Sequence, residues 1–349
     1  MVRRLRSSSN VSALSASSSE GLPFSVQESD FLEIWDWSAG FALYNQLVTT
    51  KLSHPGAADL SKSLVKIKKN LALHCDCRFV HGLPESVFDF ALLWCPADAI
   101  TTLKSDSEEP SWSWTAWDGP VNFPFDPTSC PDLKTLAKDE GPWFKSEIKR
   151  FDIGPQDAPY IIHRDRKDEK LRTQYPAFHH VPSKDVNSDW NILRFEAWSI
   201  KCETFSAEQL YYEDKVVPCS HLINDDDQQC GVIMDYHTSI SKPSDFGPYS
   251  FVLLSRNIRR EAATKTRKPK IPTMHPPGTP IWAEDHFVWD GEFADFDEDV
   301  FALGPWKMLN VMLVQWNREE TEASRIAVGR IHEDAWEKCG PEMRKITLV

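Results

Sequence analysis

Glycine is scarce in this sequence, and none of the glycine-rich motifs that cradle phosphate groups is present. The chain has 14 glycines in 349 residues, which is below the usual share of roughly 7%. It contains no G-x-G-x-x-G and no P-loop pattern, and H-E-x-x-H, G-x-S-x-G and C-x-x-C are also missing. We therefore predict no nucleotide cofactor and no catalytic residues of the enzyme classes that these motifs mark.

Positive charge and long apolar runs are also in short supply. Lys and Arg number 39 against 52 Asp and Glu, which gives a formal net charge of −13. Because a protein that binds nucleic acid needs surplus positive charge on at least one face, we expect no nucleic-acid partner. No apolar run reaches the roughly 18–20 residues that cross a bilayer, so we expect no membrane span.

Eight cysteines are spread along the chain without a secretory signal. This usage is typical of reduced thiols inside the cell, and it predicts a cytoplasmic protein. Residues 1–19 contain eight serines, three arginines and no acidic residue. Such a composition predicts a disordered tail over residues 1–27. A mitochondrial presequence is the alternative, although the arginines gather at one end and serine is a poor helix former.

Residues 28–125 have helical spacing. Apolar side chains recur at helical intervals over 29–41 and 60–71, and a third helix is expected to begin at Pro84, because proline suits the first helical position. In this prediction Val87, Phe88, Ala91 and Leu92 point inward.

Residues 126–349 are predicted to be rich in strands, because prolines recur too often for long helices. Apolar and polar residues alternate over 192–205, as in a half-buried strand. Further strands are expected at 231–235, 249–255, 309–316 and 324–331. Two charged loops lie between them, a basic one at 256–270 and an acidic one at 284–299. We predict an α+β fold in which the N-terminal helices pack on a mainly antiparallel, sandwich-like β region.

The most concentrated feature is the segment 110–120, PSWSWTAWDGP, which we call the tryptophan motif. Each indole can bury roughly 150–250 Å², so a cluster of three predicts a packing centre. The spacing predicts an extended segment followed by a turn. An exposed aromatic platform for sugars or bases is the alternative. The residues that define the motif are Pro110, Trp112, Trp114, Trp117, Asp118 and Gly119.

The tryptophan motif resembles the Pro-Ser-Trp-Ser-Trp signature of fungal heterokaryon-incompatibility (HET) domain proteins. Upstream, residues 82–94 (GLPESVFDFALLW) are similar to the family segment GLP-x-x-x-F-x-x-A-L-L-W, and residues 44–64 resemble the helical stretch before it. Downstream, residues 328–332 and 334–336 resemble the closing segment, a G-R-I strand followed by an A-W pair. The resemblance spans most of residues 40–349 and is most specific over 82–120.

The resemblance implies a role in fungal self/non-self recognition and programmed cell death. The family core, which is likened to TIR domains, contains an L-S-Y-x-W-G-like block and a D-x-x-C-I-N-Q-like block, and neither has a counterpart in this sequence. The chain therefore resembles the downstream portion of such a protein. A truncated product, a mispredicted start, and a partner or regulator are three open interpretations. All lead us to expect a non-catalytic interaction region with a protein partner, such as a full-length HET relative.

Metal-ligating residue types occur in two places, without the spacing of a known site. Zinc would find suitable ligand types at His74, Cys75, Asp76, Cys77 and His81, but a C-x-C pair is tighter than the usual spacing. A hard cation would find them at Asp285, His286, Asp290 and Glu292. The pair His179–His180 has no identifiable partner. The default prediction is no metal.

Two other functions stay open on the sequence alone. One is a β-sandwich module that binds carbohydrate or another ligand with some of Trp112, Trp114 and Trp117 exposed. The other is a metal-dependent hydrolase that uses the carboxylates of residues 284–299.

Overall fold

The computed structural model describes about half of the chain. The described residues are 79–85, 88–96, 102–103, 109–118, 121–122, 144–164, 188–212, 215–234, 248–257, 280–283, 286–289, 296–302, 304 and 306–349. The predicted tail, the two predicted helices at 29–41 and 60–71, and most of the two charged loops lie outside them.

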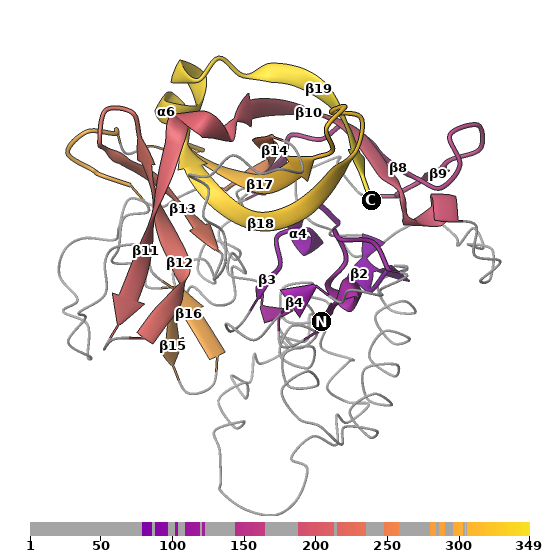
Figure 1. The fold of residues 1–349 in the computed structure, drawn as a ribbon, viewed down its shortest axis with the longest axis horizontal. Helices are drawn as coiled ribbons and strands as arrows, with labels where there is room; N and C mark the ends of the chain where they lie inside the picture. Colours follow the sequence, from indigo (N-terminus) through magenta and orange to yellow (C-terminus); the bar gives the residue numbers. More distant parts are fainter. Residues whose placement is uncertain are drawn as a thin grey trace, which may run out of the picture.

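One sheet of eleven strands forms the centre of the described structure (Figure 1). The strand order is β11-β12-β13-β18-β17-β14-β10-β8-β9, with β19 joining β10 to β18 and β7 lying beside β14. Every pair is antiparallel except β18–β19. The strands are β7 (Phe144–Ser146), β8 (Phe151–Ile153), β9 (Tyr160–Ile161), β10 (Leu193–Lys201), β11 (Phe205–Tyr212), β12 (Lys215–Asn224), β13 (Gln229–Met234), β14 (Tyr249–Asn257), β17 (Met308–Trp316), β18 (Ala323–His332) and β19 (Glu342–Leu348).

Five of these strands close into a ring. β10 pairs with β14, β14 with β17 and β17 with β18, and β19 pairs with β10 along seven positions. The ring closes where Ala323 of β18 lies opposite Leu348 of β19, and Val349 donates its N–H to the Ala323 carbonyl at 3.0 Å. The C-terminal end of the chain is therefore part of the fold.

The segment 144–153 fills a gap in the ring. β10 and β14 pair only over Ser199–Lys201 and Ser250–Val252, at the end of β10. Beyond that point β8 pairs with β10, and β7 pairs with β14. Both strands thus keep hydrogen-bond partners after they separate, as buried backbone requires.

The middle of the sheet is buried on both faces. Alternate residues of β14 and β17 belong to two different apolar clusters, since Val252 and Met312 lie in one and Phe251 and Leu313 in the other. The first cluster also holds the residues of segment 80–121, and the second holds Phe296, Phe301 and Trp336. This double burial explains the nearly continuous apolar sequence of β17, all of whose residues are buried except Gln315.

The predicted α+β class is wrong for the described part of the chain. No N-terminal helical segment of the predicted kind packs on the sheet there. The described residues between 79 and 122 form short paired strands, 3-10 turns and the helix α4 (Phe88–Ala91), and Pro84, the predicted start of the third helix, lies in a strand. The short strands are β1 (Phe79–Val80), β2 (Leu83–Pro84), β3 (Cys95–Pro96), β4 (Thr102–Leu103), β5 (Trp117–Asp118) and β6 (Val121–Asn122).

The short helix α4 and the residues that follow it have no solvent-exposed face. Every residue from Phe88 to Pro96 is buried, including Asp89, whereas a surface helix needs a polar stripe opposite its apolar one. Just before, His81 and Gly82 both have positive φ, 46° and 78°. These two residues turn the chain back between β1 and β2.

The positions of the predicted strands are confirmed, whereas the predicted sandwich of two stacked sheets is wrong. β10, β13, β14, β17 and β18 lie within a few residues of their predicted positions, and β10 alternates between buried and more exposed residues as expected. The large sheet is one curved sheet closed through β19 rather than two stacked sheets. Two elements were not predicted: α6 (Glu333–Lys338), which contacts β18, and a separate hairpin of β15 (Pro280–Ala283) and β16 (His286–Trp289).

None of the helices in the described ranges has the length and apolar character that crossing a bilayer requires.

Candidate functional site

The tryptophan motif folds as a compact turn and not as the extended segment that its spacing predicts. Residues 111–113 turn, Trp114–Ala116 form a 3-10 helix (η3), and β5 follows. Ser113 caps η3, because its side-chain oxygen accepts the N–H of Thr115 at 3.1 Å. The turn brings the side chains of the motif close together, whereas an extended chain would space them along its length.

The two central indoles of the motif are buried. Trp112 is fully buried and Trp114 is 3% exposed, while Trp117 is half-buried. Pro110 is buried as well. The backbone of Asp118 lies in β5, and Gly119 is outside the described residues. An aromatic platform for a sugar or a base needs open ring faces, which Trp112 and Trp114 do not offer.

Each indole N–H of this region is bonded to a main-chain carbonyl. Trp112 donates to Asn191 at 2.9 Å, Trp114 to Gly82 at 3.1 Å, and Trp117 to Ser111 at 3.2 Å. Trp94 donates to the carbonyl of Trp112 itself at 3.0 Å. The N–H donors of these buried rings are thus satisfied by the protein, as buried indoles require.

The contact between Trp114 and Gly82 demands glycine. A Cβ on Gly82 would lie 2.9 Å from Nε1 of Trp114 and 3.0 Å from the Thr115 side chain. The φ of +78° would also strain any other residue. Gly82 and Trp114 both belong to the segments that carry the HET resemblance.

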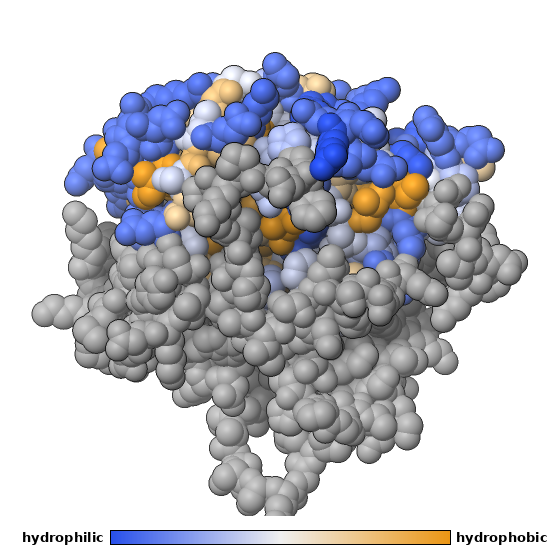
Figure 2. Space-filling model, in the orientation of Figure 1, coloured by the Kyte–Doolittle hydropathy of each residue, from blue (hydrophilic) through white to orange (hydrophobic). Residues whose placement is uncertain are grey.

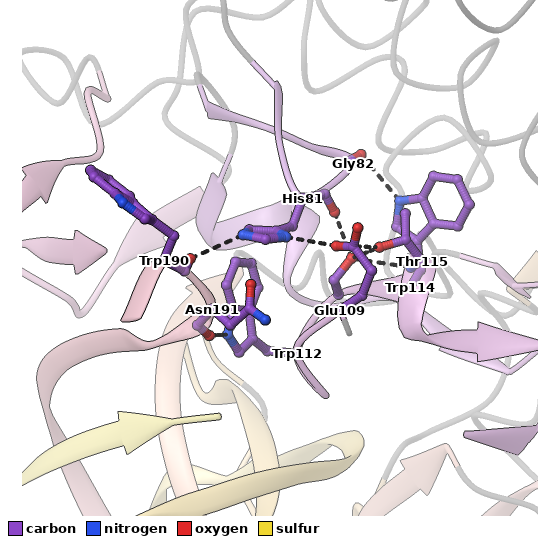
Figure 3. A network of polar contacts seen from close by, with 9 residues as sticks. His81, Gly82, Glu109, Trp112, Trp114, Thr115, Trp190 and Asn191 are labelled. Carbon is purple, nitrogen blue, oxygen red and sulfur yellow. Dashed lines mark hydrogen bonds and ion pairs between the residues drawn. The ribbon is translucent and has the colours of Figure 1, made fainter. Parts of the chain in front are cut away.

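A polar cluster around His81 holds the motif from its exposed side (Figure 3). His81 lies between two acceptors, with Nδ1 2.7 Å from Glu109 and Nε2 3.0 Å from the carbonyl of Trp190. Thr115 donates to the same Glu109 oxygen at 3.1 Å, and Ser113 donates to the carbonyl of His81 at 2.5 Å. We call these five residues the His81 clamp.

The His81 clamp lacks the geometry of a nucleophile pair. A catalytic histidine presents one ring nitrogen to a hydroxyl and the other to a carboxylate. Here the nitrogen opposite Glu109 is bonded to the carbonyl of Trp190, and the hydroxyl of Ser113 bonds to the main chain and to Thr115. The arrangement fastens three chain segments together.

A line of aromatic rings connects the clamp to the ring of strands. His81 packs edge-on against Trp112 at 5.0 Å, and Trp112 lies 6.1 Å from Phe88. Phe88 contacts Phe151 at 5.2 Å, and Phe151 contacts Phe195 of β10 at 5.0 Å. All these distances are within the range of favourable edge-to-face pairs.

Ser111 and Arg325 attach the motif to the sheet and to the C-terminal end. The N–H of Arg325 donates to the Ser111 hydroxyl at 3.0 Å, across 214 residues of sequence. Ser111 in turn donates its N–H to the carbonyl of Val349 at 3.1 Å. The buried guanidinium of Arg325 lies 3.5 Å from the ring centroid of Trp94 and donates to the Trp94 carbonyl. The motif thus bonds next to the point where β18 and β19 close the ring.

Two buried carboxylates form a second attachment. Asp89 of α4 is paired with Arg164, both with side chains only 4% exposed, and Ser146 of β7 also donates to Asp89. Glu85 accepts the hydroxyl of Tyr160 at 2.6 Å and the N–H of His163 at 2.7 Å. These bonds tie segment 85–89 to residues 146–164.

A buried histidine begins α6 at the opposite end of β18. His332 accepts the N–H of Asp334 on Nδ1 at 3.1 Å, and Nε2 donates to the carbonyl of Ala302 at 3.0 Å. Burial among Phe296 and Phe301 lowers the pKa of His332, because the charged ring loses hydration. The neutral ring fits both bonds.

The predicted metal ligands are only partly described. His81 belongs to the clamp, and His286 lies in β16, while the remaining candidates lie outside the described residues: His74, Cys75, Asp76, Cys77, His179, His180, Asp285, Asp290 and Glu292. Within the described ranges, no group of three or more His, Cys, Asp or Glu side chains is placed to hold a metal ion.

The cysteines that the structure describes are free thiols, at positions 95, 202, 219, 230 and 339. Burial raises the pKa of Cys202 and of Cys230 to about 12. Both thiols therefore stay protonated at neutral pH and are poor nucleophiles and metal ligands.

Sequence reasoning finds the burial of Trp112 and Trp114 but misses their attachments. Neither the His81 clamp nor the Ser111–Arg325 contact has a sequence signal, because each joins residues that are far apart in the chain. Comparisons with protein-family models, with curated proteins and with solved structures found no match for this chain.

Proposed function

We propose that the chain is a non-catalytic interaction protein of the fungal HET type, which acts in self/non-self recognition and programmed cell death through a protein partner. The sequence resemblance at 82–94, 110–120 and 328–336 supports this family. The cytoplasm is the proposed location, and the free thiols of the described cysteines fit a reducing compartment.

One observation carries the non-catalytic part of the proposal. In the segments with the strongest resemblance, side chains donate hydrogen bonds to main-chain carbonyls of the same segments. Trp114 donates to Gly82, Trp94 to Trp112, and Ser113 to the neighbouring His81. A signature that is buried in this way maintains a fold, and its bonded side chains offer no group to a substrate. This argument also disfavours the carbohydrate platform on Trp112 and Trp114.

Expression in a fungal host tests the proposal. Residues 1–349 expressed alone should leave cell viability and the NAD pool unchanged, because these residues contain neither the family's N-terminal blocks nor a glycine-rich site for a pyrophosphate. Co-expression with a full-length HET-domain protein should change the extent of cell death that the full-length protein causes. Viability, NAD content and co-precipitation of the two tagged proteins are the measurements.

Two outcomes would refute the proposal. Cell death or NAD loss caused by residues 1–349 alone would locate active machinery in this chain. Failure to co-precipitate with, or to alter the effect of, any full-length HET relative tested would remove the interaction role. Gly82→Ala, which disrupts the contact with Trp114, is the control, since it should abolish the co-expression effect together with the fold.

A further inference from the structure

The outer face of the β10–β19 pair carries two exposed apolar residues directly opposite each other. Among the described residues, the exposed large hydrophobic side chains are Ile161, Trp198, Val300 and Met343. Trp198 is 41% exposed and Met343 is 50% exposed, and the two are register partners. In Figure 1 this pair of strands runs along the top of the molecule, on the side away from α4, and Figure 2 shows a mostly hydrophilic surface there.

Opposite charges flank the apolar pair on the same face. Glu196 of β10 lies opposite Lys345 of β19, one position along each strand's outer face from Trp198 and Met343. Both side chains are exposed, and neither forms an ion pair within the described part of the chain. Attraction between two exposed charges across strands is weak, so both side chains remain available to a partner.

The two register pairs, Glu196–Lys345 and Trp198–Met343, form a surface that can bind a second copy of itself. Consider a two-fold axis that lies in the interface and runs parallel to the strands, midway between β10 and β19. Rotation about it places Glu196 of one copy over Lys345 of the other, and Trp198 over Met343, and each contact occurs twice. An isologous interface requires such self-complementarity, and a partner of uniform charge would leave either Glu196 or Lys345 facing a like charge.

We infer that the outer face of β10–β19 is the contact surface of a symmetric dimer of this chain. The seven register pairs of β10 and β19 cover an area on the order of 200 Å², at about 3.4 Å per residue and about 4.8 Å between strands. A stable dimer buries about 800 Å² per partner. An area this small allows only weak self-association that depends on concentration. This inference is independent of the proposed function.

Charge exchange tests the dimer with the full chain. Sedimentation equilibrium from about 10 to 500 μM, in 0.15 M salt to screen the net charge of −13, should show a monomer–dimer equilibrium. Glu196→Lys or Lys345→Glu alone places like charges opposite each other twice, and should weaken the dimer by about tenfold or more. The double variant should restore it. A mixture of the two single variants should form a heterodimer, because both of its contacts then join unlike charges.

Cross-linking with a zero-length carbodiimide supplies a direct readout. A mixture of ¹⁴N- and ¹⁵N-labelled chains should yield peptides in which Glu196 of one isotope is joined to Lys345 of the other. A wild-type chain that stays monomeric at 500 μM overturns the inference. So does a double variant that is no better than the single variants, or a mixture without heterodimer, even if the singles weaken association.

Discussion

Trp114→Ala removes the side chain that joins the tryptophan motif to segment 82–94. The ring is 3% exposed and donates to the Gly82 carbonyl at 3.1 Å. Replacement of a buried tryptophan by alanine costs about 3–5 kcal/mol, and the lost hydrogen bond accounts for about 1 kcal/mol of such a total. Since domains are stable by about 5–15 kcal/mol, we expect a much lower midpoint of unfolding and less soluble protein.

Urea unfolding followed by circular dichroism measures this cost. The midpoint should fall while the m-value stays constant. Trp114→Phe keeps most of the apolar volume without the N–H, so it should fall between wild type and Trp114→Ala. Trp198→Ala, at a position that is 41% exposed, should cost below about 1 kcal/mol when the protein is dilute. Equal midpoint shifts for Trp114→Ala and Trp198→Ala would refute the reasoning.

Three further predictions follow from the buried contacts. Asp89→Asn should cost about 3–5 kcal/mol, because it leaves the charge of Arg164 buried, and the double variant with Arg164→Met should be more stable than Asp89→Asn in a urea titration. Gly231→Ala should strongly lower the melting temperature, because its Cβ would lie 2.2 Å from a carbonyl oxygen of β18, whereas the Cβ of Gly340→Ala meets nothing within 4 Å and costs only the roughly 1–2 kcal/mol of a left-handed φ. Because burial lowers the pKa of His332 in the folded state, its stabilising effect should be full above the unfolded pKa of about 6.5 and be lost as the pH falls from there through the lower folded pKa. His332→Asn, which retains a neutral cap, should flatten the dependence of unfolding free energy on pH between 7.5 and 5.

The strand region was predictable because its signals are local. The alternation of β10 follows from one face packing on the core and the other meeting solvent, and the apolar run of β17 follows from burial on both faces. The helix expected from Pro84 is reduced to the short α4, which begins at Phe88, although Phe88, Ala91 and Leu92 are buried as predicted. Residues 88–96 are buried on every side, and an apolar run of this kind does not distinguish a helix from a turn-rich core segment.

Of the candidate site, the sequence predicted the burial of the tryptophans but not the residues that they contact. Three clustered tryptophans indicate packing, and Trp112 and Trp114 are buried. Their partners depend on contacts that no spacing encodes: Ser111 reaches Val349 only because β19 closes the ring, and Glu109 reaches His81 only because segments 79–85 and 109–118 fold together. The turn within the motif was missed because the spacing of Trp112 and Trp114 was interpreted as an extended segment, although Ser113 is a favoured cap residue and caps η3.

The central claim is that the tryptophan motif fastens the fold and does not present its rings to a ligand. Hydrogen exchange of the indole N–H protons tests it most directly, in ¹⁵N-labelled protein with signals assigned by single Trp→Phe variants. The N–H protons of Trp94, Trp112 and Trp114, each bonded to a carbonyl, should exchange orders of magnitude more slowly than that of Trp198. Exchange of Trp112 and Trp114 as fast as that of Trp198 would contradict the account.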